Sequence, residues 1–445
     1  MPKKADKKSA LPSTGRVSRG AIAGMAVARA GLTHLGHKAQ SLTRDETQRA
    51  QARQAHEAEL GRILFAALNQ LKGTALKASQ LLSMELGFVP EGMRQELARA
   101  HYQVTPLNRA LVIKVMQQEL GQEPLALFQQ FDLTAFAAAS LGQVHAATLV
   151  NGDAVAVKLQ YPGMAASIGS DMRMLRSLLK TLGGQSEALP NAAIIERVMA
   201  DLELKLAEEL DYLHEAQSLL WFGQHLTLPG LVIPQPVMSH STARVLTMQR
   251  LAGQHLNEWL LTQPSQEQRD HYGQLLFDTF LHSCFVLHRL QADPHPGNFL
   301  FMPGGHLGLL DFGCTRVLSP DFCAALAQAW SANLRIPVDT ALMQQTYRRM
   351  GLIDPALSEG DFCSQLLPAL ADVQTWQRLP FATPTYDFTQ YPSYPGSKPA
   401  NQRSALQFLQ SVPADLPYFD RAFLGLTQLL KTLGARVRTS NPWIH

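Results

Sequence analysis

Apolar residues recur every three or four positions over long parts of this chain, a spacing that predicts helices. The first such series is Leu60, Leu64, Leu68, Leu71 and Ala75. Because these side chains would share one helical face, we expect the segment from residue 46 to about residue 100 to be helical. The same spacing predicts helices over residues 109–120, 166–182, 192–220 and 269–290.

The pattern changes after residue 136, where an alanine-rich stretch precedes two strand-like runs, residues 143–150 and 154–160. Asn151-Gly152-Asp153 joins the two runs, and such residues between strands are a strong hairpin signal, because tight turns need positive φ. We expect residues 137–142 to form a tight loop before this hairpin. Further strands are expected at residues 231–233 and 244–248.

The organisation that follows from these patterns has four parts. Their expected bounds are a basic tail over 1–45, a helical extension over 46–130, an N-terminal lobe over 131–250 and a C-terminal lobe over 251–445. The last part is mainly helical, except for residues 381–400. That segment is rich in Pro, Tyr, Thr and Ser and is expected to be a long ordered loop or lid.

Composition places the chain among globular proteins, with 46% hydrophobic and 17% charged residues over 445 positions. The net charge of +3 is too small to indicate nucleic acid as a partner. The charge is uneven, however, because the first 44 residues contain nine Lys and Arg and only one acid, Asp6. This tail is expected either to be solvated or to contact an anionic membrane surface or nucleic acid.

The four cysteines contain no Cys-x-x-Cys pair, so we expect reduced thiols in a cytosol-like compartment and no zinc site. The N-terminus has no unbroken apolar core, which argues against a secretory signal. No apolar run reaches the roughly 18–20 residues that a membrane span needs. The expected location is the cytoplasm, with peripheral contact to the inner membrane, or the mitochondrial matrix in a eukaryote.

Two polar segments are the candidates for catalysis, and they contain Asp293, Asn298 and Asp311. Asn298 follows Asp293 by five positions, and a short apolar run leads to Asp311, which Phe-Gly follows. In protein kinases the first Asp accepts the hydroxyl proton, while the Asn and second Asp hold magnesium against the phosphates. We therefore expect Asp293 to be the base or water-positioning residue, and Asn298 and Asp311 to bind Mg²⁺.

Proline should stiffen this loop, because Pro294 and Pro296 fix φ on both sides of His295. His295 is expected either to bond the loop backbone or to assist the phosphates, and the structural role is favoured. A rigid loop suits a carboxylate that must be held in register with a γ-phosphate.

The second candidate group lies in the predicted hairpin. Lys158 ends the run Ala-Val-Ala-Val-Lys, where a cation can pair the α- and β-phosphates of ATP. Its counter-ion should be a glutamate on the following helix, and spacing does not choose between Glu203 and Glu209. The residues expected to cover the phosphates are Ala137, Ala138, Ala139, Ser140 and Gly142. Metal-spaced histidines and a Gly-x-Ser-x-Gly elbow are both absent from the sequence, which disfavours zinc-enzyme and hydrolase functions.

These motifs resemble those of the UbiB/AarF atypical kinases, which support ubiquinone biosynthesis in bacteria and mitochondria. The resemblance covers about residues 60–340. It rests on the alanine-rich loop with Gln143-Val144-His145, on Val-Ala-Val-Lys158, on Glu209-Leu-Asp211, on the Asp293–Asn298 loop and on Asp311-Phe-Gly. The resemblance implies an α+β, two-lobed protein-kinase-like fold with an N-terminal helical extension over the active site and a helix-rich C-terminal lobe.

The extension carries its own signature, because Lys77-Ala-Ser79-Gln80 resembles the family's Lys-x-Gly-Gln motif. Ser79 replaces the glycine. The resemblance implies that this extension lies where a peptide substrate would bind, which favours ATPase or small-molecule chemistry. Lys77 and Gln80 would share a helix face. We expect Lys77 to pair with Glu209, near Asp211, which leaves Glu203 for Lys158.

Taken together, the residues predict a Mg²⁺- and ATP-binding protein, either an ATPase or a small-molecule kinase, whose adenine hinge lies near Met248 to Leu251. The partners implied are a quinone precursor or isoprenoid lipid, and other quinone-biosynthesis proteins. Two alternatives stay open: a non-catalytic, nucleotide-gated scaffold, and a phosphotransferase of the aminoglycoside or choline type.

Overall fold

The structure is a computed structural model that describes residues 106–139, 141–183, 192–395 and 413–445, together with residues 55, 59, 61–63 and 408. The chain divides into two compact units. The first comprises the residues up to Ala216 and Pro236–Arg250, and the second comprises Gln217–Gln235 and Leu251–His445. The four-part division expected from the sequence stays a prediction, since most of residues 1–105 lie outside the described ranges.

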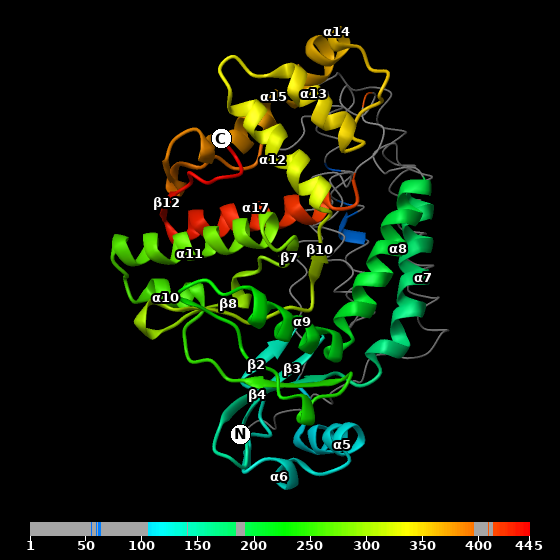
Figure 1. Cartoon of the computed structure of the whole chain (residues 1–445). Coiled ribbons are helices and arrows are strands. Elements are labelled where there is room, and N and C mark those ends of the chain that lie inside the picture. Colours follow the sequence, from blue (N-terminus) through cyan, green and yellow to red (C-terminus); the bar gives the residue numbers. More distant parts are fainter. Residues whose placement is uncertain are drawn as a thin grey trace. The chain divides into compact units, whose positions relative to one another are not determined.

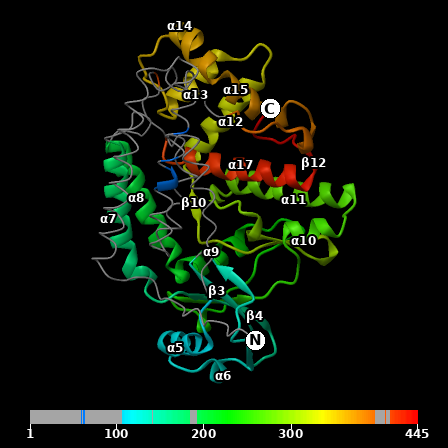
Figure 2. The ribbon, with the colours of Figure 1, turned by 180° about the vertical axis from the view of Figure 1, so that it is seen from behind.

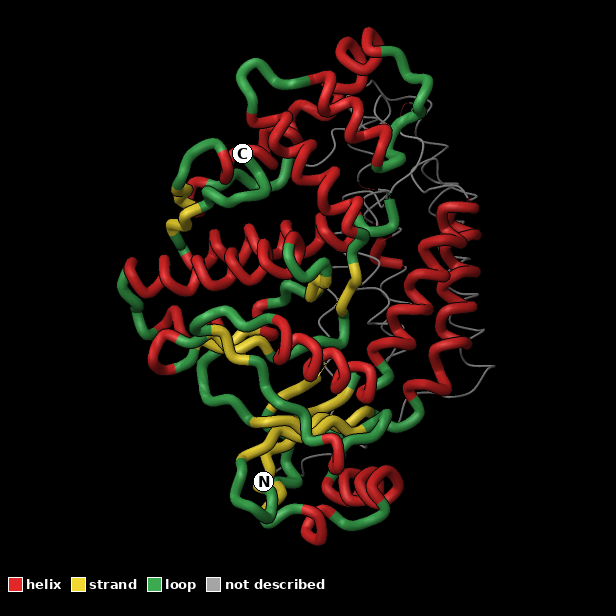
Figure 3. Tube along the Cα trace, viewed as in Figure 1, coloured by secondary structure: helices red, strands yellow, loops and turns green. Residues whose placement is uncertain are grey.

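An antiparallel five-stranded sheet forms the centre of the first unit (Figures 1 and 3). Its strands are β1 (Gln130–Phe131), β2 (Ala137–Ala139), β3 (Gly142–Thr148), β4 (Ala154–Gln160) and β6 (Val245–Gln249). The order is β1-β3-β4-β6, and β2 also pairs with β3. The hairpin predicted at Asn151–Asp153 joins β3 and β4, and Gly152 has the positive φ of 92° that this turn requires.

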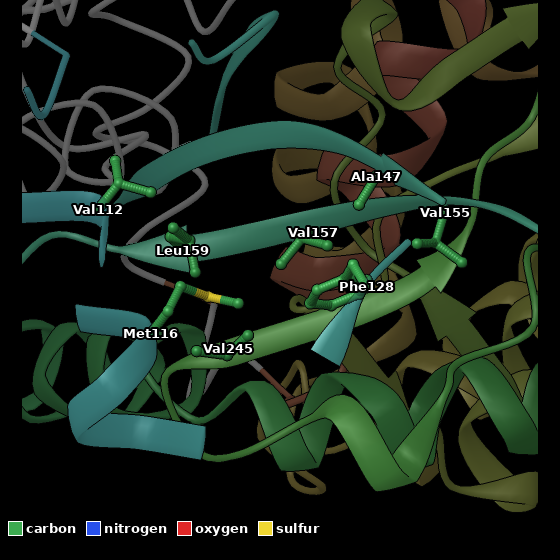
Figure 4. Close-up of a cluster of buried hydrophobic side chains, with 8 residues drawn as sticks. All are labelled: Val112, Met116, Phe128, Ala147, Val155, Val157, Leu159 and Val245. Carbon is green, nitrogen blue, oxygen red and sulfur yellow. The ribbon is translucent and has the colours of Figure 1, made fainter. Parts of the chain in front are cut away.

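Strand β4 separates a core face from a polar-bearing face, because successive side chains of a strand point to opposite sides. Val155, Val157 and Leu159 lie on the core face. Figure 4 shows them packed with Val112 and Met116 of α5 (Arg109–Leu120), and with Phe128 after α6 (Pro124–Leu127). Lys158 is therefore on the opposite face, together with Ala156 and Gln160.

Two long helices of the first unit, α7 (Met164–Gly183) and α8 (Ala192–Glu209), lie side by side (Figure 1). A single helix was predicted over residues 192–220, and this is wrong. The chain breaks at Leu210–Asp211, and a new helix, α9 (Tyr212–His225), begins. The Asp211 carboxylate accepts hydrogen bonds from the backbone N–H groups of Leu213 and His214, as an N-cap does, and so starts a new helix axis.

The second unit is mainly helical, with α11 (Gln266–Phe285) and α17 (Leu416–Leu433) side by side in both ribbon views (Figures 1 and 2). Its described residues also include most of α9, together with α10 (Leu256–Leu261), α12 (Pro320–Leu334), α13 (Thr340–Arg349), α14 (Glu359–Asp361), the π-helical η4 (Phe362–Leu366) and α15 (Leu367–Arg378). Ser265 caps α11 with Gln268 in a capping box, and Gly434, at φ 68°, ends α17.

Short strands position the polar segments of the second unit. Strands β8 (Phe299–Phe301) and β9 (Leu307–Leu309) pair antiparallel, and β5 (Leu231–Val232) pairs parallel with β9. A second ladder joins β7 (Arg289–Gln291) to β10 (Thr315–Val317). Between these strands lie the Asp293 loop with η2 (Pro296–Asn298) and, after β9, Asp311.

Two further expectations need correction. Residues 137–139 are not a loop but strand β2, in which alanines pair with Val144, Gln143 and Gly142 of β3. Part of the segment 381–400 is likewise ordered by pairing, because β11 (Thr385–Asp387) forms a ladder with β12 (Arg436–Arg438) near the C-terminus. Local composition cannot reveal a partner strand that lies about fifty residues away. Within the described ranges, no helix combines the length and apolar character that crossing a membrane requires.

Phe128→Ala should lower the free energy of unfolding by about 3–5 kcal/mol, since it opens a cavity in the core face of the sheet. The Phe128 ring is 2% exposed, whereas Leu125, in the neighbouring helix α6, is 74% exposed. Leu125→Ala is therefore the matched control and should change the unfolding free energy by about 0.5 kcal/mol or less. Denaturant unfolding measures both, and equal effects would contradict this assignment of the core.

Candidate functional site

A buried ion pair marks the polar-bearing face of the first unit's sheet. Lys158 Nζ lies 2.5 Å from Glu215 Oε1, and the two side chains are 9% and 4% exposed. This corrects the expected pairing of Lys158 with Glu203, because Glu203 Oε1 instead lies 3.3 Å from Arg176 on α7. A buried ammonium needs a buried counter-ion, whereas the Glu203 side chain is 37% exposed.

Glu215 reaches Lys158 because of the break that the Asp211 cap introduces. Glu215 lies in the first turn of α9, only four residues after Asp211. The start of α9 is also tied to the sheet unit, since the Tyr212 N–H donates to the carbonyl of Ala243. The signal available in the sequence was Asp211 itself, an N-cap residue that shows where a new helix begins.

Strand register collects several predicted nucleotide-binding residues on the Lys158 face. Lys158 lies opposite Val144 on β3, and Val144 lies opposite Ala137 on β2. On the other side, Ala156 lies opposite Met248 on β6. Because paired residues in a ladder share a face, Ala137, Lys158 and Met248 all lie on this face. Leu251 follows the end of β6 and belongs to the second unit.

Gly142 has a steric role in the alanine-rich segment. A Cβ at this position would lie 2.2 Å from the carbonyl oxygen of Leu159 and 2.9 Å from the Tyr212 hydroxyl. Gly142 therefore permits close approach of backbones inside the β3–β4 ladder, and not the positive φ that a flexible phosphate loop would use. Ala138 and Ala139 lie on β2, while Ser140 is outside the described residues.

A buried polar pair supports the same hairpin from its core face. The His145 Nδ1 atom bonds the carbonyl of Asp132 at 2.7 Å, and its Nε2 lies 2.7 Å from Gln143 Nε2. The Gln143 Oε1 atom accepts the N–H of Leu107. Burial lowers the pKa of His145 below its usual value, although the bond to Asp132 opposes this shift. His145 therefore has a neutral, structural place in the sheet.

In the second unit, a hydrogen-bond network holds the Asp293 loop to the segment that carries Asp311. Asn298 Nδ2 donates to the Asp293 carbonyl at 2.9 Å and to Asp293 Oδ2 at 3.2 Å. Gln291 Nε2 donates to the carbonyl of Asp293 at 2.8 Å and to that of Asp311 at 3.2 Å. The Leu310 N–H, in turn, donates to the Asn298 carbonyl. These bonds bring together the three residues that the motif spacing singled out.

The remaining turns of the site are held by local bonds. His295 Nδ1 accepts the N–H of Gly297 at 3.0 Å, a structural role of the kind that the sequence favoured. The Asp311 Oδ1 atom accepts the N–H of Gly313 at 2.9 Å, which orients this carboxylate at the start of the Asp-Phe-Gly turn. Phe312 is fully buried against Phe222, which anchors the turn.

The donor set of this site suits magnesium. With its Nδ2 atom committed to Asp293, Asn298 has its Oδ1 available as a ligand, and Asp311 offers a carboxylate. Among the residues that the structure describes, no group of three or more His, Cys, Asp or Glu is arranged to hold a metal ion. Magnesium is usually held by one or two carboxylates plus substrate phosphates, so two side-chain oxygens fit this ion.

Helix α17 contributes two contacts that the sequence reasoning missed. Arg421 Nη2 lies 2.9 Å from Asp293 Oδ1. A Cβ on Gly425 would lie 2.0 Å from Pro294 Cγ, so the helix backbone packs directly on the loop. Arg421 is 128 residues from Asp293, and no local motif announces it. The sequence analysis predicted only that this part of the chain is mainly helical.

The residues predicted for the regulatory extension are only partly described. Glu209 is the last residue of α8, and Asp211 caps α9. Lys77, Ser79 and Gln80 lie outside the described residues, as does the expected pairing of Lys77 with Glu209.

A comparison with family models supports the kinase-like interpretation of this geometry. The model of the ABC1 atypical kinase-like domain matches residues 99–346, more than half of the chain. The chain belongs to the ABC1 atypical kinase-like family. The expected UbiB/AarF resemblance and the α+β, kinase-like fold are thereby confirmed.

Curated relatives of this ABC1 family protein carry kinase names. The chain is 33% identical over 269 residues to a probable serine/threonine-protein kinase, abkA, of Dictyostelium discoideum, covering 57% of this chain and 46% of the relative. It is 34% identical over 257 residues to the mitochondrial atypical kinase COQ8 of Saccharomyces cerevisiae, covering 57% and 50%. The chain thus spans about half the length of the curated relatives it matches.

A solved structure matches a larger part of this chain than the curated relatives do. The complex structure of Rv3197–erythromycin from Mycobacterium tuberculosis matches with a TM-score of 0.59 and 25% identity, covering 88% of this chain and 96% of that chain. The likeness supports the fold over nearly all of the protein.

Glu215→Gln should destabilise the protein by about 3–5 kcal/mol, because it removes the buried negative charge that lies 2.5 Å from the Lys158 ammonium. Glu203→Gln is the control, since Glu203 forms a more exposed pair with Arg176, and it should cost about 1 kcal/mol or less. Denaturant unfolding of both variants tests the pairing. A loss for Glu203→Gln as large as that for Glu215→Gln would contradict the assignment of Glu215 as the buried partner of Lys158.

Proposed function

We propose that this chain is an atypical kinase-like enzyme that binds ATP with Mg²⁺ and hydrolyses or transfers the γ-phosphate. The observation that supports it most is the hydrogen-bond network that joins Asp293, Asn298 and Asp311. A buried Lys158–Glu215 pair in the sheet unit adds the phosphate-orienting cation that such chemistry needs.

The proposed roles divide between the two units. In the sheet unit, Lys158 orients the α- and β-phosphates, and the alanine-rich segment Ala137–Ala139, with Ser140 and Gly142, covers them. Glu215, rather than Glu203, fixes the ammonium of Lys158. The backbone from Met248 to Leu251 binds adenine. In the helical unit, Asn298 and Asp311 hold the magnesium ion, which when bound neutralises charge on the phosphates.

Asp293 acts as the base or as the residue that positions a water. Its Oδ1 accepts from Arg421 and its Oδ2 accepts from Asn298. A carboxylate has about four lone-pair sites, so each oxygen can still accept the proton of a hydroxyl or of water. The two bonds therefore orient Asp293 without using up its capacity as an acceptor.

The proposed biological role is support of ubiquinone biosynthesis, with a quinone precursor or isoprenoid lipid as the second ligand. The relatives named COQ8 are mitochondrial proteins. The basic stretch in residues 1–44 would allow peripheral contact with an anionic membrane. We further propose that the segment 46–130, with Lys77 and Gln80, restricts the acceptor to small molecules, and that its partners are other quinone-biosynthesis proteins.

A nucleotide-gated scaffold without turnover is the second candidate. The observation that favours it is that both oxygens of Asp293 already accept hydrogen bonds from side chains of the protein itself. A scaffold would bind ATP and keep its biological role in Asp293→Asn, whereas it would lose that role in Lys158 or Asp311 variants.

Asp311→Asn should reduce magnesium-dependent ATP hydrolysis by at least about 100-fold, because a carboxylate that holds the metal against the phosphates is lost. The matched control is Asp321→Asn in the same unit, whose side chain is 90% exposed, and which should keep wild-type turnover. Phosphate release is measured with and without anionic liposomes and a phenolic quinone precursor.

A rate that rises with both additions, and is lost in Asp311→Asn, supports the proposed enzyme. Phosphate found on the hydroxyl of the precursor identifies a small-molecule kinase, and free phosphate alone identifies an ATPase. Turnover at background level in the wild type, despite ATP binding, would instead support the scaffold.

A further inference from the structure

A buried arginine contacts the candidate catalytic carboxylate from a helix near the C-terminus. The Arg421 side chain is 8% exposed and that of Asp293 is 20% exposed, with 2.9 Å between Nη2 and Oδ1. An ion pair this far from solvent is costly unless its geometry is good. Because this buried ion pair involves Asp293, we expect the role of Arg421 to lie in the Asp293 loop.

The geometry at Asp293 is that of a carboxylate held at both ends. Arg421 donates to Oδ1, and Asn298 donates to Oδ2 at 3.2 Å. Because the two donors come from different segments of the chain, together they fix the rotation of the carboxylate plane. Asn298 alone is part of the same loop and could move with it. Arg421 supplies the reference point outside the loop.

Helix α17 is itself well packed, so Arg421 is held in a fixed position. Its buried positions include Phe419, Phe423, Leu426 and Leu430, and it packs along α11 (Figure 2). Gly425 follows Arg421 by four residues, so both lie on one helix face. On that face Gly425 contacts Pro294 directly, where a Cβ would lie 2.5 Å from Pro294 Cβ. One face of α17 thus touches two adjacent residues of the Asp293 loop.

We propose that Arg421 is a positioning residue for Asp293, so that α17 forms part of the catalytic apparatus. This inference rests on the proposed function in one respect, since its kinetic consequence requires turnover of ATP. The guanidinium sets the orientation of the Asp293 carboxylate, and the packing of Gly425 on Pro294 sets the distance of the loop from α17. Arg421 acts through Asp293 and makes no contact with the phosphates in this scheme.

Two other roles for the same contact make different predictions. A purely structural ion pair would change the stability of the protein but not the turnover of the folded fraction. An inhibitory contact, in which Arg421 masks Asp293, would give faster turnover when the arginine is removed. Kinetics of folded variants therefore separate the three roles.

The test compares Arg421→Met and Arg421→Lys with Arg436→Met in the full-length chain. Arg436 is a matched control, because it also pairs with an aspartate of the second unit, Asp387, at 3.5 Å and with a largely exposed side chain. The measurements are kcat and KM for magnesium-dependent ATP hydrolysis, corrected for the folded fraction. Each variant is also made in the Asp293→Asn background.

Positioning predicts that Arg421→Met lowers kcat about 30-fold or more while KM for ATP stays within about twofold, because orientation at the reacting carboxylate affects the chemical step and not nucleotide binding. Arg421→Lys, which keeps the charge but not the planar fork, should recover part of the loss. Arg436→Met should resemble the wild type. In Asp293→Asn, Arg421→Met should have no further effect on kcat.

Three kinetic results would overturn the proposal. The first is an unchanged kcat in folded Arg421→Met, and the second is a raised kcat in that variant. The third is a double variant with Asp293→Asn whose loss of kcat equals the product of the two single losses. Should Arg421→Met fail to fold, Gly425→Ala provides an independent variant without a charge change. Its new Cβ would displace Pro294, so it should lower kcat with KM retained, and wild-type kcat in Gly425→Ala would count against the proposal.

Hydrogen exchange in the nucleotide-free protein separates a failure of this inference from a failure of the proposed function. The N–H groups of Gly297 and Asn298 are bonded to His295 inside the loop. If the wild type shows no ATP turnover, the proposed enzyme fails, but faster exchange of these amides in Arg421→Lys and Gly425→Ala than in Arg436→Met still supports positioning. Equal exchange in all variants would refute it.

Discussion

The amide of Asn298, bonded to both the carbonyl and the carboxylate of Asp293, is the interaction on which the candidate site depends. These bonds close the loop on itself across the two prolines, and they use only the nitrogen of the Asn298 amide, so its oxygen is the candidate ligand atom for a cation. Gln291 extends the network by donating to the carbonyls of Asp293 and Asp311. The proposed base and the two proposed metal-binding side chains are therefore held in fixed relative positions, which would lower the cost of ordering them during reaction.

In the sheet unit, the main physical constraint is the charged ammonium of Lys158 in the mainly apolar strand β4. Alternation along β4 sends Val155, Val157 and Leu159 into the core and Lys158 to the other face. Lys158 is nevertheless buried, so its charge requires Glu215 at 2.5 Å. The cap at Asp211 aims the first turn of α9 at the sheet, and the break between α8 and α9 is thus part of how the cation is held.

Membership of the ABC1 family establishes that this is a kinase-like protein, but it does not establish which reaction the protein catalyses. The family match and the kinase names of the relatives agree with the donor set of the second unit. The relatives are about twice as long as the matched part, so their activities do not transfer without a test. Helix α17 lies beyond residue 346, where the family match ends, whereas the Asp293 loop that it contacts lies within the match. The contact therefore joins a segment that the family model matches to one that it does not cover.

By itself, the sequence determined what short-range order controls: the β3–β4 hairpin, the helix over residues 109–120, and the grouping of Asp293, Asn298 and Asp311 by motif spacing. It misplaced the counter-ion of Lys158. Glu203 and Glu215 lie less than four helical turns apart in the sequence, and the Asp211 cap between them turns the chain in a new direction. It could not find Arg421 or Gly425, whose partners lie more than 120 residues away. Only tertiary packing decided these contacts, because burial of a helix face brings distant side chains together without leaving any local periodic trace.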